Sequence, residues 1–471
     1  MKSEIFKLLN TYKNKNHISF AMPGHKNGRG ISSELRKSFF ELDVTELADT
    51  ESLHEPGTVL SDMLRDTAKF YGADRSFVLV NGSTSGIFTM LMSCCNPGER
   101  VLINRGCHIS AINACIVLGL MPDFIPQEVI PTLGIADTPG SSVIENMLNE
   151  NKYSAVFITS PTYYGLSADI EGIAKITKKR NIPLLVDEAH GAHFSGNKKI
   201  FPKPAIESGA DMCVQSAHKT LNAMNQTAFL HYKRGLVDEN RVKKCYSIYQ
   251  TTSPSYPMIA SADMARCELE SSGEQMWERV LTRCNELRKN FEGTLVSPDK
   301  SWVGKYNFND IDECRLVFNV GEYDITGFEL AEKLRVEYKI DVEMADLYQI
   351  VMIPTPSNTD ENFKMLEKSL REIIKNTKKR TAENEVIIPP KTERVISPAQ
   401  AFYKKGKFVP VDKAVGCVAK SMVVPYPPGI AVLVPGEKIT AEIIEYIQCL
   451  IKSGAEIHGL TDGEIEVEDN N

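Results

Sequence analysis

The chain has 471 residues, of which 42% are hydrophobic and 24% charged, an ordinary composition that excludes collagen-like, coiled-coil and disordered proteins. Its 61 acidic and 54 basic residues leave a net charge of -7, without the basic patch that a nucleic-acid-binding protein needs. No apolar stretch approaches the roughly 20 residues of a membrane span. The charged N-terminus is unlike a signal peptide, and the 11 cysteines lie mostly in apolar stretches. We therefore expect a cytoplasmic protein with free thiols.

The first part of the chain predicts a large α/β domain over 71–295, preceded by an N-terminal segment, 1–70. Short runs rich in Val, Ile and Phe alternate there with helix-like segments, a pattern typical of a mostly parallel sheet with helices on both faces. The predicted strands are 76–80, 100–104, 155–160, 182–188 and 211–216. Several end in polar residues, and ligands of such sheets bind beyond the carboxyl ends of the strands.

The pattern changes after residue 295 to a predicted small α+β domain over 296–376. Thr326 and Glu329 have the spacing of a capping box at the start of its first helix. A charged, Pro-containing stretch then predicts a linker over 377–396. Ser397-Pro398, an N-cap followed by a first helical residue, opens a C-terminal α+β module over 397–471.

The first candidate functional feature follows strand 76–80, where Asn81-Gly82-Ser83-Thr84-Ser85-Gly86 leads into an apolar helix. Hydroxyl side chains and free backbone N–H groups at a helix N-terminus bind phosphate well. A plain Ser/Thr helix cap explains the motif equally well. The motif is neither a Walker loop nor a GxGxxG fingerprint, so it does not indicate a mononucleotide site.

Asp187 ends the apolar strand IPLLVDE, where a carboxylate is unfavourable unless it has a partner. That partner is either a main-chain cap or a cation such as the protonated ring nitrogen of a cofactor. His190 and His193 lie three residues apart, but no third ligand with metal-site spacing follows them, so we predict no metal.

Lys219 lies in Ser216-Ala217-His218-Lys219-Thr220, directly after the next predicted strand. Taken alone, such a lysine is usually a surface residue with its ammonium group in water. A desolvated lysine, in contrast, is a usable amine nucleophile. A hydroxyl-rich helix start, then an acid, then a lysine are together the parts that pyridoxal phosphate requires.

A series of motifs then runs in a fixed order through nearly the whole chain. They are Ala21-Met22-Pro23-Gly24-His25-Lys26, Asp43-Val44-Thr45-Glu46-Leu47, NGSTSG, CHIS, DEAHGAH, SAHKT, Tyr426-Pro427-Pro428-Gly429 and Pro435-Gly436-Glu437. In these motifs the chain resembles the bacterial-type ornithine, lysine and arginine decarboxylases, which are fold-type-I pyridoxal-phosphate enzymes of aspartate-aminotransferase-like fold. The resemblance is to the short form, which lacks the extra N-terminal domain of the long inducible enzymes.

The resemblance implies that Lys219 binds pyridoxal phosphate covalently, Asp187 pairs with its ring nitrogen and His108 stacks on its ring. From the residues alone, His108 is an ordinary histidine in a polar turn. The cofactor-binding set implied by the resemblance is Ser83, Thr84, Ser85, His108, Asp187, Ala189, His190, Ser216, His218 and Lys219, with Thr252 and Ser253 reaching the neighbouring subunit. A homodimer is then the smallest active unit.

The resemblance also implies decarboxylation of a basic amino acid to a polyamine-pathway amine, with arginine as first choice and lysine or ornithine next. Asp43, Glu46 and Glu437 are the candidates for binding the cationic substrate.

Two alternative functions stay open. One is another fold-type-I enzyme, an aminotransferase or a β-lyase, for which Arg315 or Arg335 would bind the α-carboxylate. The other is a catalytically silent, cofactor-binding regulator.

Overall fold

A computed structural model describes residues 3–47, 49–380, 388–425 and 429–469, so that Tyr426-Pro427-Pro428 and part of the predicted linker lie outside the described residues. Its centre is a seven-stranded sheet with the order β2-β11-β10-β9-β7-β3-β4. The strands β10, β9, β7, β3 and β4 are mutually parallel, whereas β11 is antiparallel to β10 and β2. The bounds are β2 Arg75–Leu79, β3 Arg100–Asn104, β4 Met121–Ile125, β7 Ala155–Thr159, β9 Leu184–Asp187, β10 Met212–Gln215 and β11 Ala228–Tyr232.

The five strands predicted from the sequence are confirmed, and the α/β fold class with them. The sequence pattern did not identify β4 and β11. β4 is an edge strand of the sheet, and β11 is the antiparallel strand between β2 and β10. Alternate residues of β3 explain why its sequence is continuously apolar: Val101 and Ile103 pack on one face and Leu102 on the other. A strand buried on both faces has no polar side to alternate with.

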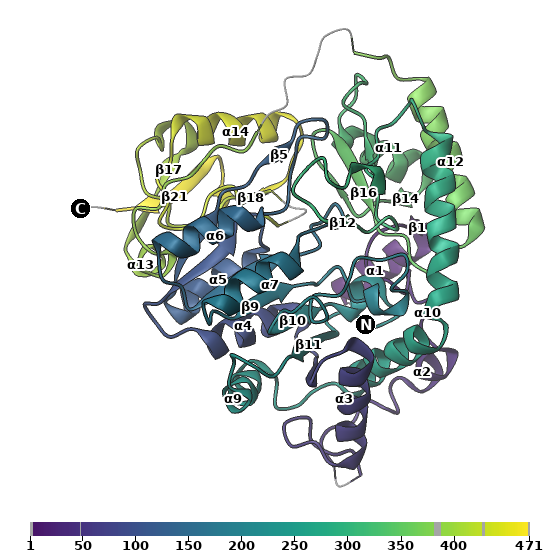
Figure 1. Cartoon of the computed structure of the whole chain (residues 1–471). Coiled ribbons are helices and arrows are strands. Elements are labelled where there is room, and N and C mark those ends of the chain that lie inside the picture. Colours follow the sequence, from purple (N-terminus) through teal and green to yellow (C-terminus); the bar gives the residue numbers. More distant parts are fainter. Residues whose placement is uncertain (1–2, 48, 381–387, 426–428, 470–471) are drawn as a thin grey trace.

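Helices cover both faces of the sheet (Figure 1). Residues of α4, α5 and α9 share one apolar cluster with strand residues such as Ile103, and residues of α6 and α7 share another with Leu102. The helices of this part of the chain are α3 Thr58–Tyr71, α4 Gly82–Cys94, α5 Ile109–Leu118, α6 Ser141–Glu150, α7 Ile170–Lys179, α8 Ala217–Thr220 and α9 Glu239–Tyr249. Every strand of this sheet except the antiparallel β11 is thereby held with its carboxyl end at the same edge.

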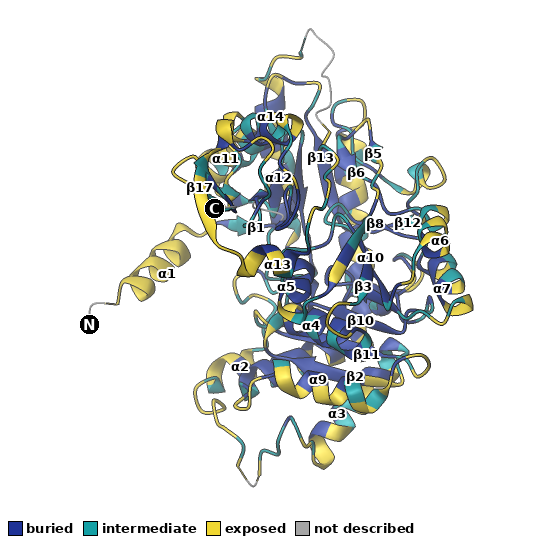
Figure 2. Ribbon diagram, turned by 90° about the vertical axis from the view of Figure 1, so that its left-hand side faces the viewer, coloured by how far each residue is buried: buried dark blue, intermediate teal, exposed yellow. Residues whose placement is uncertain are grey.

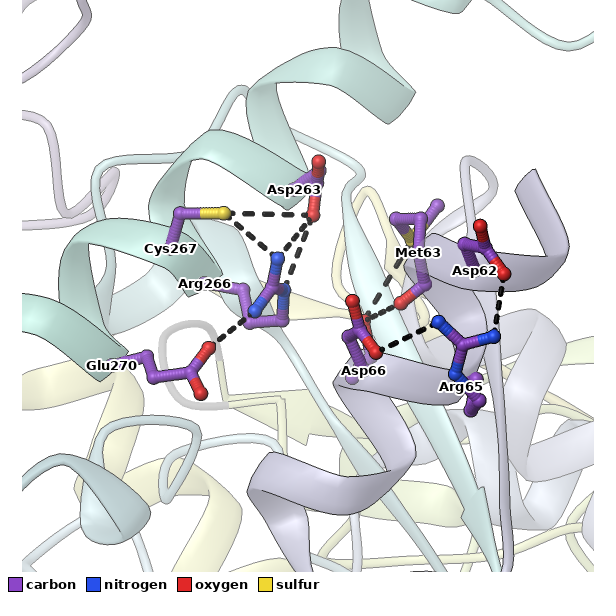
Figure 3. Close-up of polar contacts among 9 residues, drawn as sticks. Asp62, Met63, Arg65, Asp66, Asp263, Arg266, Cys267 and Glu270 are labelled. Carbon is purple, nitrogen blue, oxygen red and sulfur yellow. Dashed lines mark hydrogen bonds and ion pairs between the residues drawn. The ribbon is translucent and has the colours of Figure 1, made fainter. Parts of the chain in front are cut away.

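The long helix α10 (Tyr256–Asn290) leads from the large sheet to a three-stranded sheet of order β13-β16-β15. Its elements are β13 Leu316–Asn319, α11 Gly327–Tyr338, β15 Met344–Ala345, β16 Gln349–Met352 and α12 Asp360–Lys375. The predicted capping box is confirmed, since Thr326 Oγ1 accepts from the Glu329 N–H and the Glu329 carboxylate accepts from the Thr326 N–H. Figure 3 shows that α10 and α3 also carry ion pairs within their own turns, Arg266 with Asp263 and Glu270, and Arg65 with Asp62 and Asp66.

The C-terminal part folds around its own apolar cluster, which includes Leu433, Ile443 and Val467. It contains α13 Pro398–Tyr403, β17 Gly406–Pro410, β18 Val424–Pro425, α14 Ala441–Lys452, β19 Ile457–His458, β20 Leu460–Thr461 and β21 Glu464–Glu468. Ser397 caps α13 as predicted. The C-terminal part also contacts the large domain: α13 packs on α5, one of the helices that cover the seven-stranded sheet.

Short elements complete the described ranges. They are α1 Glu4–Lys15, β1 Ile18–Ser19, α2 Ser33–Ser38, β5 Val129–Ile130, β6 Ile135–Ala136, β8 Leu166–Ser167, β12 Asp310–Ile311 and β14 Ile340–Asp341. Figure 2 shows α1 standing away from the body with its surface exposed. No helix in the described ranges combines the length and the apolarity that crossing a bilayer requires.

Candidate active site

A cavity of about 570 Å³ lies at the carboxyl ends of β10, β9, β7 and β3. Segments that are far apart in the sequence meet there: the start of helix α4, the turn before α5, the end of β9 and the segment after β10. Nine of the predicted site residues line it, namely Ser83, Thr84, His108, Asp187, Ala189, His190, Ser216, His218 and Lys219. The strand ends therefore do meet at one site, as expected for an open α/β sheet.

Lys219 lies on the single-turn helix α8 immediately after β10, with its ammonium nitrogen facing this cavity. Burial lowers the pKa of Lys219, and the nearby Arg315 lowers it further, whereas Asp187 and Glu343 oppose the shift. Its Nζ lies 3.1 Å from His190 Nε2. A lysine so desolvated carries a larger fraction of neutral, nucleophilic amine than an exposed one.

A chain of hydrogen bonds sets the tautomer of His190. Arg315 Nη2 lies 3.3 Å from His190 Nδ1, and a guanidinium group has only donors, so Nδ1 must accept. In a neutral ring the proton then resides on Nε2, 3.1 Å from Lys219 Nζ, so the imidazole can donate to that nitrogen when the amine is neutral. Arg315 is buried and does not line the cavity, so it lies behind His190.

Asp187 ends β9 and is buried, with the Ala189 N–H donating to its Oδ1 at 3.1 Å. Burial raises the pKa of its carboxyl group, and Lys219 opposes this shift. One bond from the backbone leaves most acceptor positions of the carboxylate open. The Asp187 carboxylate is thus capped by a main-chain N–H, one of the two partners considered from the sequence. Its remaining acceptor positions are available to the other, a cation in the cavity.

Ser83 and Ser216 form the hydroxyl-lined end of the cavity, where their Oγ atoms are 2.6 Å apart. Asn81, the N-cap of α4, makes no side-chain capping bond, so the first N–H groups of this 13-residue helix are not satisfied by their cap. Ser85 differs from the prediction, because its hydroxyl donates to the Gly82 carbonyl and it does not line the cavity. The reason is helical geometry, which turns Ser85 toward the core.

His108 is the N-cap of α5 and accepts from the Ser110 N–H through Nδ1. Burial and the charge of Lys219 lower the pKa of His108 to about 4. The C-terminal part reaches this turn: the Ile109 N–H donates to the Gly429 carbonyl, and Ile430 lines the cavity. The turn that carries His108 is therefore stabilised by bonds within its own helix start and by a bond to the C-terminal part.

Thr252 and Ser253 are exposed and do not line this chain's own cavity, and neither do Asp43 and Glu46. Glu437 requires a correction, because its buried carboxylate is already occupied. Arg105 binds it with two bonds of 2.6 and 3.0 Å, and Thr392 Oγ1 and the Val434 N–H also donate to it. The sequence indicated an acid beside the substrate, but the fold uses Glu437 to fasten the C-terminal part to the end of β3.

Glu437→Ala is expected to destabilise the protein by roughly 3 kcal/mol, because it leaves Arg105 largely buried without its anion. The KM for substrate should stay within about twofold in the folded fraction, since Glu437 does not line the cavity. Chemical denaturation and steady-state kinetics measure the two effects. Arg65→Ala, which removes an exposed ion pair, is the control and should change the unfolding midpoint little. A large rise in KM with unchanged stability would restore Glu437 as a substrate ligand.

Because several histidines are buried, we expect the folding stability of the ligand-free protein to decrease at acidic pH. Burial lowers the pKa of His108 and His218 to about 4 and that of His231 to about 3, from an ordinary 6.5. The unfolded chain therefore binds these protons at a higher pH, so the contribution of these three histidines to stability is complete above about pH 6.5 and falls as the pH drops toward 4. The slope is at most about 1.4 kcal/mol per pH unit for each histidine. Denaturant titrations at several pH values measure this slope, and His231→Gln should make it shallower.

The cavity also contains residues that sequence reasoning missed. Asn104 and Thr159 end β3 and β7, and the rule about polar strand ends could have found both. Tyr163, whose ring lies 4.4 Å from that of His190, and Asp137 come from loops, and no pattern in the sequence marked them. His193 pairs with Asp312 at 3.2 Å. In the described part of the chain no cluster of three metal-binding side chains was found.

Comparison with known proteins gives a consistent result. Residues 3–362 match the family model "Orn/Lys/Arg decarboxylase, major domain", and residues 377–466 match "Orn/Lys/Arg decarboxylase, C-terminal domain". The chain is 32% identical to the arginine decarboxylase of Bacillus anthracis, over 98% of this chain and 95% of that protein, and 31% identical to that of Bacillus subtilis, over 98% and 96%. The lysine decarboxylase structure from Francisella novicida has the same fold (TM-score 0.78, 20% identity), over 98% of this chain and 80% of that one. This short chain with its mostly parallel sheet thus belongs to the Orn/Lys/Arg decarboxylase family of amino-acid carboxy-lyases.

Proposed function

We propose that this protein uses pyridoxal phosphate to decarboxylate a basic amino acid, with L-arginine as the first choice and L-lysine or L-ornithine next. The observation that carries the proposal is the convergence of Lys219, Asp187 and the hydroxyl-lined start of α4 in one cavity. The choice of arginine rests on the two arginine decarboxylases that the chain resembles over its full length.

The residues present fit pyridoxal phosphate in three respects. Uncapped N–H groups of α4 with Ser83, Thr84 and Ser216 would hold the phosphate. Asp187, buried and with open acceptor positions, would pair with the ring nitrogen. Lys219 supplies an amine of lowered pKa for the aldehyde carbon.

Once bound, pyridoxal phosphate supplies an electron-withdrawing ring that accepts the electron pair left when CO2 departs. The chain's own groups do the rest. Asp187 would hold a carboxylate at the ring nitrogen, and His108 and Ala189, which line the same cavity, would bound the space for the ring. Lys219 Nζ would hold the cofactor through its aldehyde carbon and, in its protonated form, is our candidate for donating a proton to the substrate Cα.

We further propose a homodimer whose partner supplies Thr252 and Ser253. These hydroxyl residues are exposed here and stand away from their own chain's cavity. Large apolar side chains of the N-terminal segment are also exposed, among them Phe40 at 87% and Val59 at 72%. A dimer would cover such groups, since exposed apolar surface favours association. Light scattering on the purified protein measures the subunit number.

The position of Arg315 favours decarboxylation over transamination. An aminotransferase needs an arginine that meets the substrate α-carboxylate, and Arg315 instead lies behind His190, outside the cavity lining. Retention of Lys219, Asp187 and His108 in one cavity argues against a silent regulator.

The test is incubation of purified protein and pyridoxal phosphate with L-arginine, L-lysine and L-ornithine separately, with chromatography for agmatine, cadaverine and putrescine and measurement of CO2. We expect agmatine and CO2 in equal amounts. Formation of a keto acid without CO2 would instead identify an aminotransferase, and no turnover with any of the three would contradict the proposal.

A further inference from the structure

The cavity extends well beyond the strands that carry Asp187 and Lys219. Asp137 lines its far part, where the Asp137 N–H donates to the Glu128 carbonyl just after β4. Asp137 follows β6 and pairs by its backbone with Glu128 after the edge strand β4, whereas Asp187 ends β9, which is separated from β4 by β7 and β3 in the sheet order. Asp137 and Asp187 are the two acidic residues in the lining, and they come from different parts of the chain, the loop after β6 and the end of β9.

The Asp137 carboxylate is rigidly held. Its Oδ1 accepts from the Thr138 N–H and its Oδ2 from the Asn307 N–H, both at 2.7 Å. Only 2% of the residue is exposed. The Phe308 N–H acts on the same carboxyl group. Because an ionised carboxylate has about four acceptor positions, about one remains available beside these three backbone donors.

Asp137 also lacks a counter-cation. Burial raises the pKa of its carboxyl group, and the groups that oppose the shift are backbone N–H donors, with Glu128 raising it further. In the described ranges no Lys, Arg or His side chain pairs with it. Glu437, in contrast, has Arg105 as its cation, whereas Glu188 and Asp346 do not line the cavity and are held by neutral donors within the fold. A buried anion without a cation is unfavourable unless a ligand supplies one.

We propose that Asp137 is the specificity-determining residue that binds the cationic tail of the substrate. This deepens the proposed function and rests on it. A basic amino acid reacting beside Lys219 directs its side chain along the cavity, past Asn104 and Gln127, toward this carboxylate. The guanidinium or ammonium group at its end completes an ion pair with charge-assisted hydrogen bonds.

The test compares L-arginine with L-citrulline, a neutral analogue of nearly the same shape, in the holoenzyme. Asp137→Asn should raise the KM for arginine at least about 30-fold and remove most of the preference for arginine over citrulline. kcat should change much less, because Asp137 stands away from Lys219. The matched control is Glu128→Gln, which removes an exposed neighbouring carboxylate that does not line the cavity and should leave both values unchanged.

Two further measurements keep the outcome clear. Calorimetric titration of arginine into the wild type and Asp137→Asn reports tail binding even if no amine forms, so failure of the proposed function is distinguished from failure of this inference. If Asp137→Asn does not fold, Asp137→Glu keeps the charge but moves it one methylene, and should shift the kcat/KM preference from arginine toward ornithine about tenfold. Folded variants with the wild-type arginine preference and affinity would overturn the proposal.

Discussion

Lys219→Ala is expected to lower the rate of amine formation by at least about 10⁴-fold, the scale on which enzymes lose activity with their nucleophile. No other lysine lines the cavity in the described ranges, so no second amine can take its place. The stability of the fold should change little, because the Lys219 side chain faces the cavity and its hydrogen bond is to His190. Product chromatography over several hours measures the residual rate.

The matched control for this variant is Lys233→Ala. Lys233 follows β11, whose antiparallel direction puts it at the opposite edge of the sheet, where its Nζ donates to the Gly72 carbonyl. That variant should retain turnover within a few-fold. If Lys219→Ala kept more than a few per cent of the activity while Lys233→Ala lost it, the catalytic assignment would be wrong.

Asp187→Asn should lower kcat roughly 10³-fold, with a smaller change in KM. Asparagine has nearly the same shape as aspartate and can still accept the Ala189 N–H bond, so the backbone turn is preserved. What is lost is the negative charge at the ring-nitrogen end of a buried site, where a neutral amide cannot hold a proton on a pyridine nitrogen. Weaker retention of pyridoxal phosphate on dialysis should accompany the loss of rate.

Asp211→Asn is the comparison for this second variant. Asp211 is equally an aspartate at a buried position of the sheet, and burial raises the pKa of its carboxyl group too. It precedes β10 rather than ending a strand, and it accepts from the Leu184 N–H at the edge away from the cavity. Its variant should lose some stability but keep kcat. Equal losses of kcat in both variants would show that Asp187 acts through the fold alone.

The site residues differ in how far their positions could be predicted from the sequence. Asp187 and Ser216 could be predicted because each directly follows an apolar strand, and parallel strands bring such ends to one edge. Glu437 could not be placed this way. Its motif indicated a functional acid, but whether a carboxylate meets a substrate or Arg105 depends on a contact between residues 332 apart.

The strands β4 and β11 show the same limit at the level of the fold. Met121–Ile125 contains a proline and an aspartate, and its role as an edge strand appears only from its pairing with β3. Ala228–Tyr232 has an antiparallel direction that depends on its pairing with both β10 and β2. Neither pairing leaves a periodic signal within the segment itself.

The sequence by itself determined the fold class and placed Asp187, Lys219 and the Ser83 region next to strand ends, because these follow from local hydrophobic patterns. The role predicted for His108 came from the order of the family motifs, since its local pattern indicates only a polar turn. Only the tertiary structure decided that Glu437 is an interdomain anchor, that Arg315 orients His190, and that Asp137 faces the cavity without a counter-cation. The physical reason is that pairing, burial and charge compensation are set by neighbours in space, and those neighbours come from distant parts of the chain.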